Sequence, residues 1–329
     1  MEKQSFEQIF NSYFHLKYTL EEFKNTKLEL SKNIKELTYT KHTFIAYIKT
    51  NKKLIPNSIL LKNYHKFINS IIVKYLNVHK NVYSYKEGIN LKNTLDKHKK
   101  NRYFLKMDII NFFNSVNSSM IESLIKNNSD NYPISDISKY ITYIINLISF
   151  NDTLPVGFVT SSGISNAILY EFDKYISEYC KNNNIEYSRY SDDLIFSNSD
   201  YKELKKLESI VIKNLDKLYD DKLKINQEKT IYLSKAKTVN ILGLVITTQG
   251  HITVNKNIKE DIKHLLYFYK NDKIKFDDFL NKKYNNSIVK AYGILNYIND
   301  IDKDFILYLR KKYKNHIIDK FLHGDKTLG

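Results

Sequence analysis

The spacing of hydrophobic and polar positions changes several times along the chain, and each change predicts a new element. Apolar residues recur at helical spacing over residues 5–38 and again over 60–76, which predicts two helices. The run 102–108 (RYFLKMD) is apolar and ends in an acid, so it predicts a buried strand with an exposed carboxyl end. A loop and then a helix are expected next, at residues 151–159 and 160–179.

Two short apolar runs farther along, 186–190 and 194–197, flank the tripeptide Ser191-Asp192-Asp193. This pattern predicts a tight hairpin with two acids at its tip. An amphipathic helix is expected at 201–219, and the pattern is helical from residue 258 onward. Four further strands are expected between these helices, at residues 223–225, 230–233, 240–246 and 251–254. The expected fold class is α+β, with a βαββ-type centre between helical flanks.

Composition narrows the chemistry that this fold can carry. The single cysteine, Cys180, excludes an internal disulfide framework and a cysteine-based zinc site, and the nine histidines show no metal-ligand spacing. Residues 1–14 lack the apolar core of a signal peptide. The longest apolar stretch, 140–150, is too short to cross a bilayer. We therefore expect a cytoplasmic protein without a membrane partner, and any metal should be bound by oxygen ligands.

The net charge allows two interpretations. Lys and Arg number 52 against 36 Asp and Glu, a formal charge of +16, and such an excess attracts the phosphate backbone of nucleic acids. The chain is also rich in Lys, Asn, Ile and Tyr, all encoded by AT-rich codons, so genome composition could supply much of the excess. The 27 Tyr and 18 Phe offer rings on which bases could stack, or core residues.

Adjacent acids at a hairpin tip repel each other unless a cation lies between them. Asp192 and Asp193 form such a pair between two apolar strands, whereas the pairs at 220–221 and 277–278 lie in lysine-rich loops and suit ordinary turns. Nucleotidyl transfer with two metal ions needs two or three carboxylates, because Mg²⁺ fills the rest of its shell with water and substrate phosphates.

Three segments resemble the motifs of bacterial reverse transcriptases and occur in the order of that family. YSRYSDDLIFS (187–197) resembles the active-site hairpin, FLKMDIINFFNSV (104–116) the first palm motif, and LPVGFVTSSGISN (154–166) the Pro-x-Gly loop with its helix. Weaker similarities extend to segments 84–88, 223–230, 241–247 and 292–298. The resemblance implies a right-hand polymerase with three parts: N-terminal helices and fingers (1–105), palm with fingers insertions (106–250) and thumb (251–329).

The resemblance also implies roles for individual residues. Two Mg²⁺ ions, with Mn²⁺ as an alternative, would be held by Asp108 and Asp192, with Asp193 and the backbone carbonyl of Ile109 in support. Phe113 would block a ribose 2′-hydroxyl and so favour dNTPs, with core packing as its alternative role. Other nucleotide-binding and primer-grip positions implied are Gly157, Lys86 and Lys229, and Leu242 and Gly243. Lys229 would protonate pyrophosphate, although a surface lysine is the competing interpretation.

Some positions depart from the family pattern. Val156 stands where many reverse transcriptases have glutamine. Retron enzymes usually carry Asn-Ala-x-x-His and Val-Thr-Gly, where this chain has TLDKH (94–98) and ILG (241–243). These departures favour the related defence-associated or abortive-infection groups over an ordinary retron enzyme.

The expected function is RNA-directed DNA synthesis from dNTPs in antiphage defence. Its partners would be an RNA template, for which a dedicated non-coding RNA is one candidate, the DNA product, and a second copy of the chain or an associated effector protein. Three alternatives remain open: a retron enzyme that makes RNA-linked DNA, RNA synthesis from rNTPs, and a non-catalytic RNA-binding assembly protein with the same fold.

Overall fold

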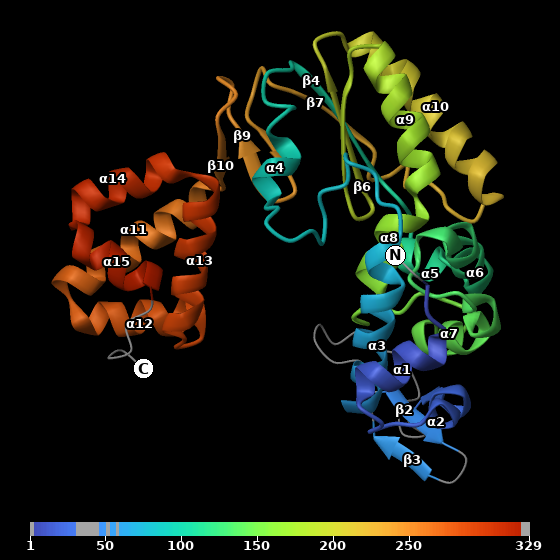
Figure 1. Ribbon diagram of the computed structural model, residues 1–329. Helices are drawn as coiled ribbons and strands as arrows, with labels where there is room; N and C mark the ends of the chain where they lie inside the picture. Colours follow the sequence, from blue (N-terminus) through green and yellow to red (C-terminus); the bar gives the residue numbers. More distant parts are fainter. Residues whose placement is uncertain (1–2, 31–45, 51–52, 57–58, 324–329) are drawn as a thin grey trace.

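A computed structural model of the protein describes residues 3–30, 46–50, 53–56 and 59–323. A central antiparallel sheet joins two limbs, the N-terminal elements on one side and the C-terminal helices on the other (Figure 1). The mixture of helices and antiparallel strands confirms the α+β class. No helix in the described part of the chain is long and apolar enough to cross a bilayer.

The central sheet has four strands in the order β5-β6-β4-β7, all antiparallel. The predicted strand at 102–108 and the predicted hairpin are both confirmed, and the hairpin lies beside that strand. The register places Asp193 opposite Asp108 on one side and opposite Tyr190 on the other. The strands span Tyr103–Asp108 (β4), Glu186–Tyr190 (β5), Asp193–Asn198 (β6) and Ile231–Ser234 (β7).

Side chains of the central strands alternate between two hydrophobic cores, because successive residues of a strand point to opposite faces. On β4, Leu105 and Met107 pack in the first core and Phe104 in the second. Lys106 and Asp108 therefore share the face of Phe104. Asp193, which lies directly opposite Asp108, is on this face as well. The alternation of side chains along the strands therefore places both acids on the second-core face of the sheet.

Helices α9 and α10 cover the first-core face (Figure 1). The helix predicted at 201–219 is confirmed, but the one predicted at 160–179 is two helices. The break falls at Leu169, whose φ of −93° and ψ of 13° leave the helical region. The three helices span Ser161–Ile168 (α8), Tyr170–Asn182 (α9) and Tyr201–Tyr219 (α10).

The single helix predicted over 5–38 is wrong. Ser5 caps α1 by accepting from the backbone N–H of Gln8, and α1 ends where His15 and Leu16 take the left-handed φ values of 49° and 60°. A second helix and a strand follow, and residues 31–38 lie outside the described ranges. The elements of this limb are Phe6–Phe14 (α1), Leu20–Asn25 (α2), Lys27–Leu30 (β1), Ala46–Thr50 (β2) and Lys53–Pro56 (β3).

The helix predicted at 60–76 is confirmed as α3, Ile59–Ile71, followed by the short 3₁₀ turn Val73–Tyr75. Residues 151–159 form the expected loop, apart from an isolated bridge between Phe150 and Thr153. Between β4 and this loop lie small helices that pack on α3 and α8. They span Phe112–Ser115 (α5), Ser118–Asn127 (α6) and Ile141–Ile148 (α7), with 3₁₀ turns at Ser129–Asn131 and Ile137–Lys139.

The second core joins the central sheet to the C-terminal helices through α4 and a small three-stranded sheet (Figure 1). The strand predicted at 240–246 is a hairpin, because Leu242 and Gly243 turn the chain with φ values of 54° and 77°. The predicted strand at 223–225 is reduced to one bridge, from Ile225 to Ile109. The elements are Leu91–Leu95 (α4), Val239–Ile241 (β8), Leu244–Ile246 (β9) and Ile252–Val254 (β10).

The helical pattern expected from residue 258 onward is confirmed, with the first helix starting two residues earlier. These helices pack their apolar faces around the second core and form the C-terminal limb. They span Lys256–Asn271 (α11), Lys273–Tyr284 (α12), Ile288–Ile301 (α13), Lys303–Tyr313 (α14) and Asn315–His323 (α15).

A close contact between α8 and the turn after α3 supplies a stability test. A Cβ added at Gly163 would lie 2.2 Å from Cγ1 of Val73, a stiff β-branched side chain. We expect Gly163→Ala to lower the free energy of unfolding by about 1–3 kcal/mol through overpacking. The matched change Gly293→Ala meets nothing within 4 Å and should stabilise α13 by about 0.5–1 kcal/mol. Urea denaturation of both variants checks this, and equal effects would contradict the packing argument.

Candidate active site

The sheet brings the three sequence-predicted aspartates together. Asp108 ends β4, and its direct neighbour across the strands is Asp193, the first residue of β6. The backbone carbonyl of Asp192 accepts from the N–H of Ile109 at 3.2 Å, which ties the hairpin tip to the end of β4. The carbonyl of Asp108 accepts from the N–H of Asn226 at 2.7 Å. Both strand ends are thus fixed by backbone hydrogen bonds.

The hairpin tip differs from the predicted one by one residue. Because Tyr190 pairs with Asp193, the turn consists of Ser191 and Asp192 alone, and only one of the two acids lies at the tip. Ser191 has a φ of 57°, an uncommon left-handed value for a serine. Its N–H donates to the hydroxyl of Ser84 at 2.9 Å, so this conformation is held by a contact from a distant segment.

Two lysines neutralise part of the negative charge. The Lys229 ammonium lies 3.2 Å from Oδ2 of Asp108, and the Lys106 ammonium lies 2.8 Å from Oδ1 of Asp193. Asp192 has no ion pair among the described residues. Burial raises the pKa of Asp192, and the negative charges of Asp193 and Asp108 raise it further. A proton or a cation from outside the chain would therefore stabilise the Asp192 carboxylate.

A fully buried ion pair holds the hairpin from the opposite face of the sheet. The guanidinium of Arg189 contacts both oxygens of Asp173 on α9, with Nε to Oδ1 at 2.9 Å and Nη2 to Oδ2 at 2.6 Å. Nη1 donates to the backbone carbonyl of Ser191 at 2.9 Å, and Nη2 also donates to the carbonyl of Asn166 at 2.8 Å. Tyr187 donates its hydroxyl to the same carboxylate at 2.6 Å. One arginine thereby links the hairpin turn to α8 and α9.

Serine, asparagine and histidine side chains complete the support. The Ser84 hydroxyl donates to the amide oxygen of Asn166 at 2.8 Å, and the Asn166 amide returns a bond to the Ser84 carbonyl. His98 lies between the hydroxyls of Ser188 and Ser197, 2.7 Å from each. Burial lowers the pKa of His98 to about 3, so the ring is neutral and has one donor and one acceptor for the two serines.

Two of the expected nucleotide-binding segments, those of Phe113 and Gly157, are joined by a backbone hydrogen bond. Phe112 is buried, whereas Phe113 is only half-buried, so the second ring is the one that can face a ligand. The carbonyl of Phe113 accepts from the N–H of Leu154 at 3.3 Å, which fixes the start of the loop that contains Gly157. Gly157 has a φ of 99°, a value that favours glycine, and the space around it is open.

Lys86 and the Leu242-Gly243 turn lie apart from this group. The Lys86 ammonium donates to the carbonyl of His79 at 3.2 Å, and burial, together with the charge of Arg189, lowers its pKa. Leu242 packs against the second core at the β8–β9 turn. No polar contact of the described residues joins either position to the aspartates.

Sequence reasoning missed the residues whose partners are distant in the chain. Lys106 lies inside the first palm-like motif, and its position two residues before Asp108 could have signalled a shared face. Asp173 carried no local signal, because it is one acid among several on an amphipathic helix.

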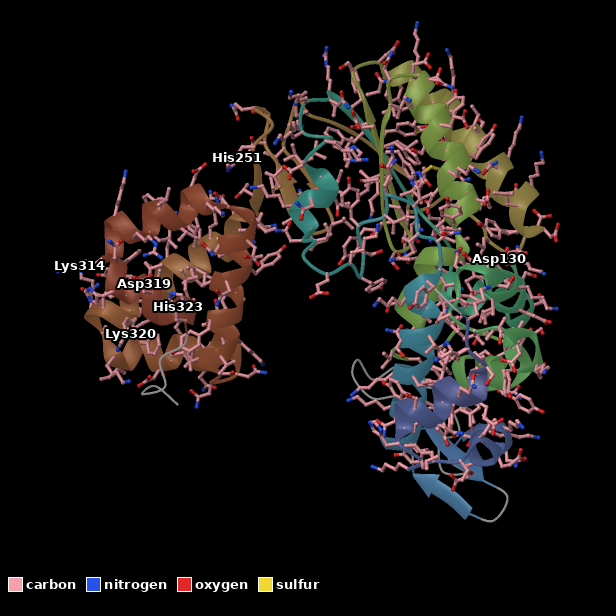
Figure 2. All side chains as sticks on the ribbon, in the orientation of Figure 1. Asp130, His251, Lys314, Asp319, Lys320 and His323 are labelled. Atoms are coloured by element: carbon pink, nitrogen blue, oxygen red, sulfur yellow. The ribbon has the colours of Figure 1, made fainter. Side chains whose placement is uncertain are left out.

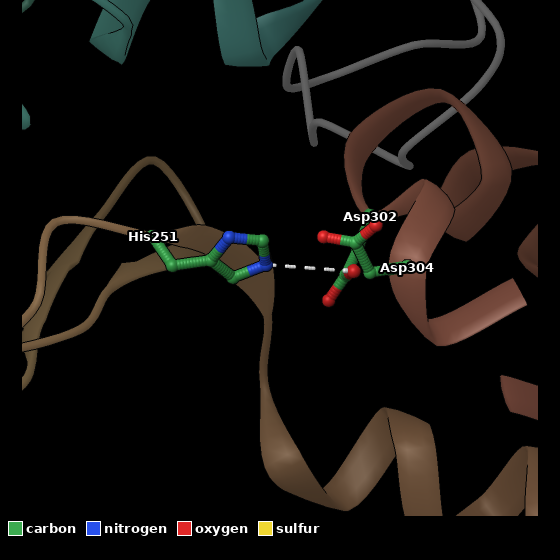
Figure 3. A group of neighbouring side chains, drawn as sticks. All are labelled: His251, Asp302 and Asp304. Atoms are coloured by element: carbon green, nitrogen blue, oxygen red, sulfur yellow. Dashed lines mark ion pairs between the residues drawn. The ribbon is translucent and has the colours of Figure 1, made fainter. Parts of the chain in front are cut away.

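A second group of titratable side chains consists of His251, which is labelled in Figure 2, and the nearby Asp302 and Asp304 (Figure 3). Nε2 of His251 is 3.5 Å from Oδ1 of Asp302. Asp302 is already bound by the Lys259 ammonium at 2.6 Å, by the hydroxyl of Thr253 and by the N–H of Phe305. Although burial opposes it, the bond from Lys259 holds the pKa of Asp302 below its usual range. Through Asp302 the group anchors α14 on β10 and α11.

Comparison with known proteins identifies similar chains. Residues 47–246 match the family model described as reverse transcriptase (RNA-dependent DNA polymerase). The chain is 29% identical over 262 residues to the retron Ec83 reverse transcriptase of Escherichia coli, covering 77% of this chain and 80% of that protein. It is 27% identical over 271 residues to the retron Ec73 reverse transcriptase of E. coli, covering 80% and 82%. A solved telomerase structure from Candida albicans is 12% identical to this chain, with a TM-score of 0.44. The alignment covers 98% of this chain and 66% of the telomerase chain.

The buried ion pair gives a second prediction. Arg189→Met leaves the Asp173 carboxylate buried without its partner, so we expect the free energy of unfolding to fall by about 3–5 kcal/mol. Arg310→Met is the matched control, because Arg310 and Asp319 form a partly exposed pair whose loss should change stability by less than about 1 kcal/mol. Chemical denaturation measures both, and a similar small effect at Arg189 would refute its anchoring role.

Proposed function

The chain belongs to the reverse transcriptase family, and from that premise we propose that it extends DNA by two-metal nucleotidyl transfer at Asp108 and Asp192. It is an RNA-directed DNA polymerase of the bacterial retron type, with an RNA template and a DNA product as its partners. The observation that carries the mechanism is the cluster of Asp108, Asp192 and Asp193 at the end of β4 and the β5–β6 turn.

The donor set fits hard divalent ions, which reverse transcriptases use. Asp108 and Asp192 are proposed to hold two Mg²⁺ ions, or Mn²⁺, with Asp193 and the carbonyl of Ile109 in support. The lack of an ion pair at Asp192 among the described residues supports this assignment, because a half-buried carboxylate without a cation keeps a raised pKa. When bound, such ions activate a 3′-hydroxyl and stabilise the departing pyrophosphate.

The residues around the aspartates are proposed to position the nucleotide. Phe113 would exclude a 2′-hydroxyl, and the open space at Gly157 would allow backbone to approach the sugar or phosphates. The Lys229 ammonium is 64% exposed by side-chain area, so it can leave Asp108 for a pyrophosphate oxygen. Lys86 is proposed to hold the triphosphate, and the Leu242-Gly243 turn is proposed as the primer grip.

The domain division stays a proposal of the same kind: fingers within 1–105, palm within 106–250 and thumb within 251–329. The second hydrophobic core contains β8 to β10 together with the C-terminal helices, so by packing β8 and β9 join the thumb although the proposed division keeps them in the palm. On this proposal the positively charged chain binds its RNA template between these parts. We also propose three further partners: a dedicated non-coding RNA, a second copy of the chain and an effector protein.

The carboxylates give the direct test of this mechanism. Asp108→Asn or Asp192→Asn should reduce dNTP incorporation on an RNA template at least a hundredfold or so, because each removes a metal ligand. The double change Asp220→Asn with Asp221→Asn is the control, since asparagine tolerates the left-handed φ values of 47° and 59° found there. Primer extension with Mg²⁺ measures the effect. Full activity of Asp192→Asn would disprove the mechanism. RNA binding by the unaltered protein without any nucleotide incorporation would instead favour a non-catalytic RNA-binding protein.

Sugar selection gives a separate test. Phe113→Ala should increase incorporation of rNTPs relative to dNTPs by roughly tenfold or more, because it removes the ring proposed to block the 2′-hydroxyl. Phe113→Tyr keeps a ring of the same width and should retain the preference for dNTPs. Competition assays with paired nucleotides measure the ratio. An unchanged ratio in Phe113→Ala would assign the ring to core packing.

A role in antiphage defence is proposed from the departures from the retron motifs at 94–98 and 241–243. Cells that express the protein from its native locus should then lower phage plating efficiency, and Asp192→Asn should restore plating. Equal plating with both forms would remove this role while leaving the polymerase activity in place. Synthesis of an RNA-linked DNA is the alternative role, and sequencing of the co-purifying nucleic acid tests for that product.

A further inference from the structure

The three aspartates differ in what already holds them. Asp193 is bound at 2.8 Å by Lys106, Asp108 is bound at 3.2 Å by Lys229, and Asp192 has no ion pair among the described residues. The two lysines are not equivalent. The side chain of Lys106 is 24% exposed, and that of Lys229 is 64% exposed. A half-buried ion pair is screened less by water and salt than an exposed one, so the Lys106 pair is the more persistent.

The sheet explains why Lys106 stays in place. Its neighbours across the strands are Ile195 on β6 and Ile231 on β7, and directly opposed residues share one face of a sheet. The alkyl stem therefore rises between two isoleucines, and the ammonium reaches diagonally to Asp193. Lys229 ends the turn at 227–229, where the side chain of Asn226 accepts from its backbone N–H at 3.2 Å.

We propose that Lys106 is a positioning residue that keeps Asp193 out of the metal-binding set, so that the ions are held by Asp108 and Asp192. This inference rests on the proposed two-metal function and narrows it, because it replaces the supporting role of Asp193 in metal binding. Asp193 and Asp108 are directly opposed, and like charges at such positions repel. The Lys106 ammonium removes that repulsion and converts Asp193 into half of a neutral pair. Asp192 is then the carboxylate without an ion pair, and Asp108 is the carboxylate that can exchange its lysine for a metal ion.

Binding of Mn²⁺ to the full chain without nucleic acid tests this, with free Mn²⁺ counted by electron paramagnetic resonance. Lys106→Met frees Asp193 as an additional ligand and removes a positive charge, so Mn²⁺ should bind roughly threefold or more tightly. Lys106→Arg keeps the charge and should bind Mn²⁺ like the unaltered protein. Lys126→Met is the matched control, because it removes the same charge from the exposed pair with Glu122 on α6.

The decisive variant removes both members of the pair. Lys106→Met combined with Asp193→Asn should bind Mn²⁺ as the unaltered protein does, since a neutral pair that does not ligate has been replaced by neutral side chains. If this double variant binds as weakly as Asp192→Asn, Asp193 is a metal ligand and the proposal is overturned. Because the double variant carries no unpaired charge, it also remains informative if Lys106→Met alone does not fold.

Asp192→Asn separates this inference from the function on which it rests. If both Asp192→Asn and the double variant lose Mn²⁺ binding, the positioning role of Lys106 is rejected and the two-metal assignment stands. Unchanged Mn²⁺ binding in Asp192→Asn rejects the two-metal assignment itself. Retained affinity in the double variant with lost affinity in Asp192→Asn supports both.

Discussion

The buried ion pair between Arg189 and Asp173 is the constraint on which the arrangement of the β5–β6 hairpin depends. Arg189 is fully buried and makes bonds to a side chain on α9, to the turn at Ser191 and to the carbonyl of Asn166. A buried ion pair contributes little net stability compared with apolar packing, but its geometry is demanding. The benefit is therefore one of position: the turn that presents Asp192 cannot shift without breaking a pair that has no water to replace it.

The two faces of the central sheet differ in how far their charged side chains are neutralised. On the first-core face, the buried charges of Arg189 and Asp173 neutralise each other, and the Tyr187 hydroxyl donates a hydrogen bond to the carboxylate. The second-core face places three carboxylates against two ammonium groups and leaves Asp192 uncompensated. Such an imbalance is unfavourable for the folded chain on its own, and it persists because rigid strands and a well-bonded turn hold the carboxylates there. The site is thus prepared to bind cations before any substrate arrives.

Local signals predicted the elements that carry the aspartates. The strand at 103–108 and the hairpin around Asp192 follow from short apolar runs and turn residues, and their motifs identified the family. The helix breaks at His15 and Leu169 could not be predicted, because the residues there are ordinary helix formers and tertiary packing decides the break. Partners such as Asp173, Ser84 and Lys106 depend on strand register and on contacts between distant segments, which a single sequence does not reveal.

The two hydrophobic cores on opposite faces of one sheet have a consequence for slow motions. Almost all of the second core belongs to β8–β10 and the C-terminal helices. Among the described residues, its buried members from the rest of the chain are Leu95, Phe104 and Ile195, and the partly buried Leu91 and Leu233 pack against it. A cooperative unit with so few apolar ties can open as a whole while the first core stays closed. Amide hydrogens of α11–α15 would then exchange together and faster than those of α9 and α10. The C-terminal limb would act as a separately melting foldon, able to detach from a bound duplex without disturbing the aspartates.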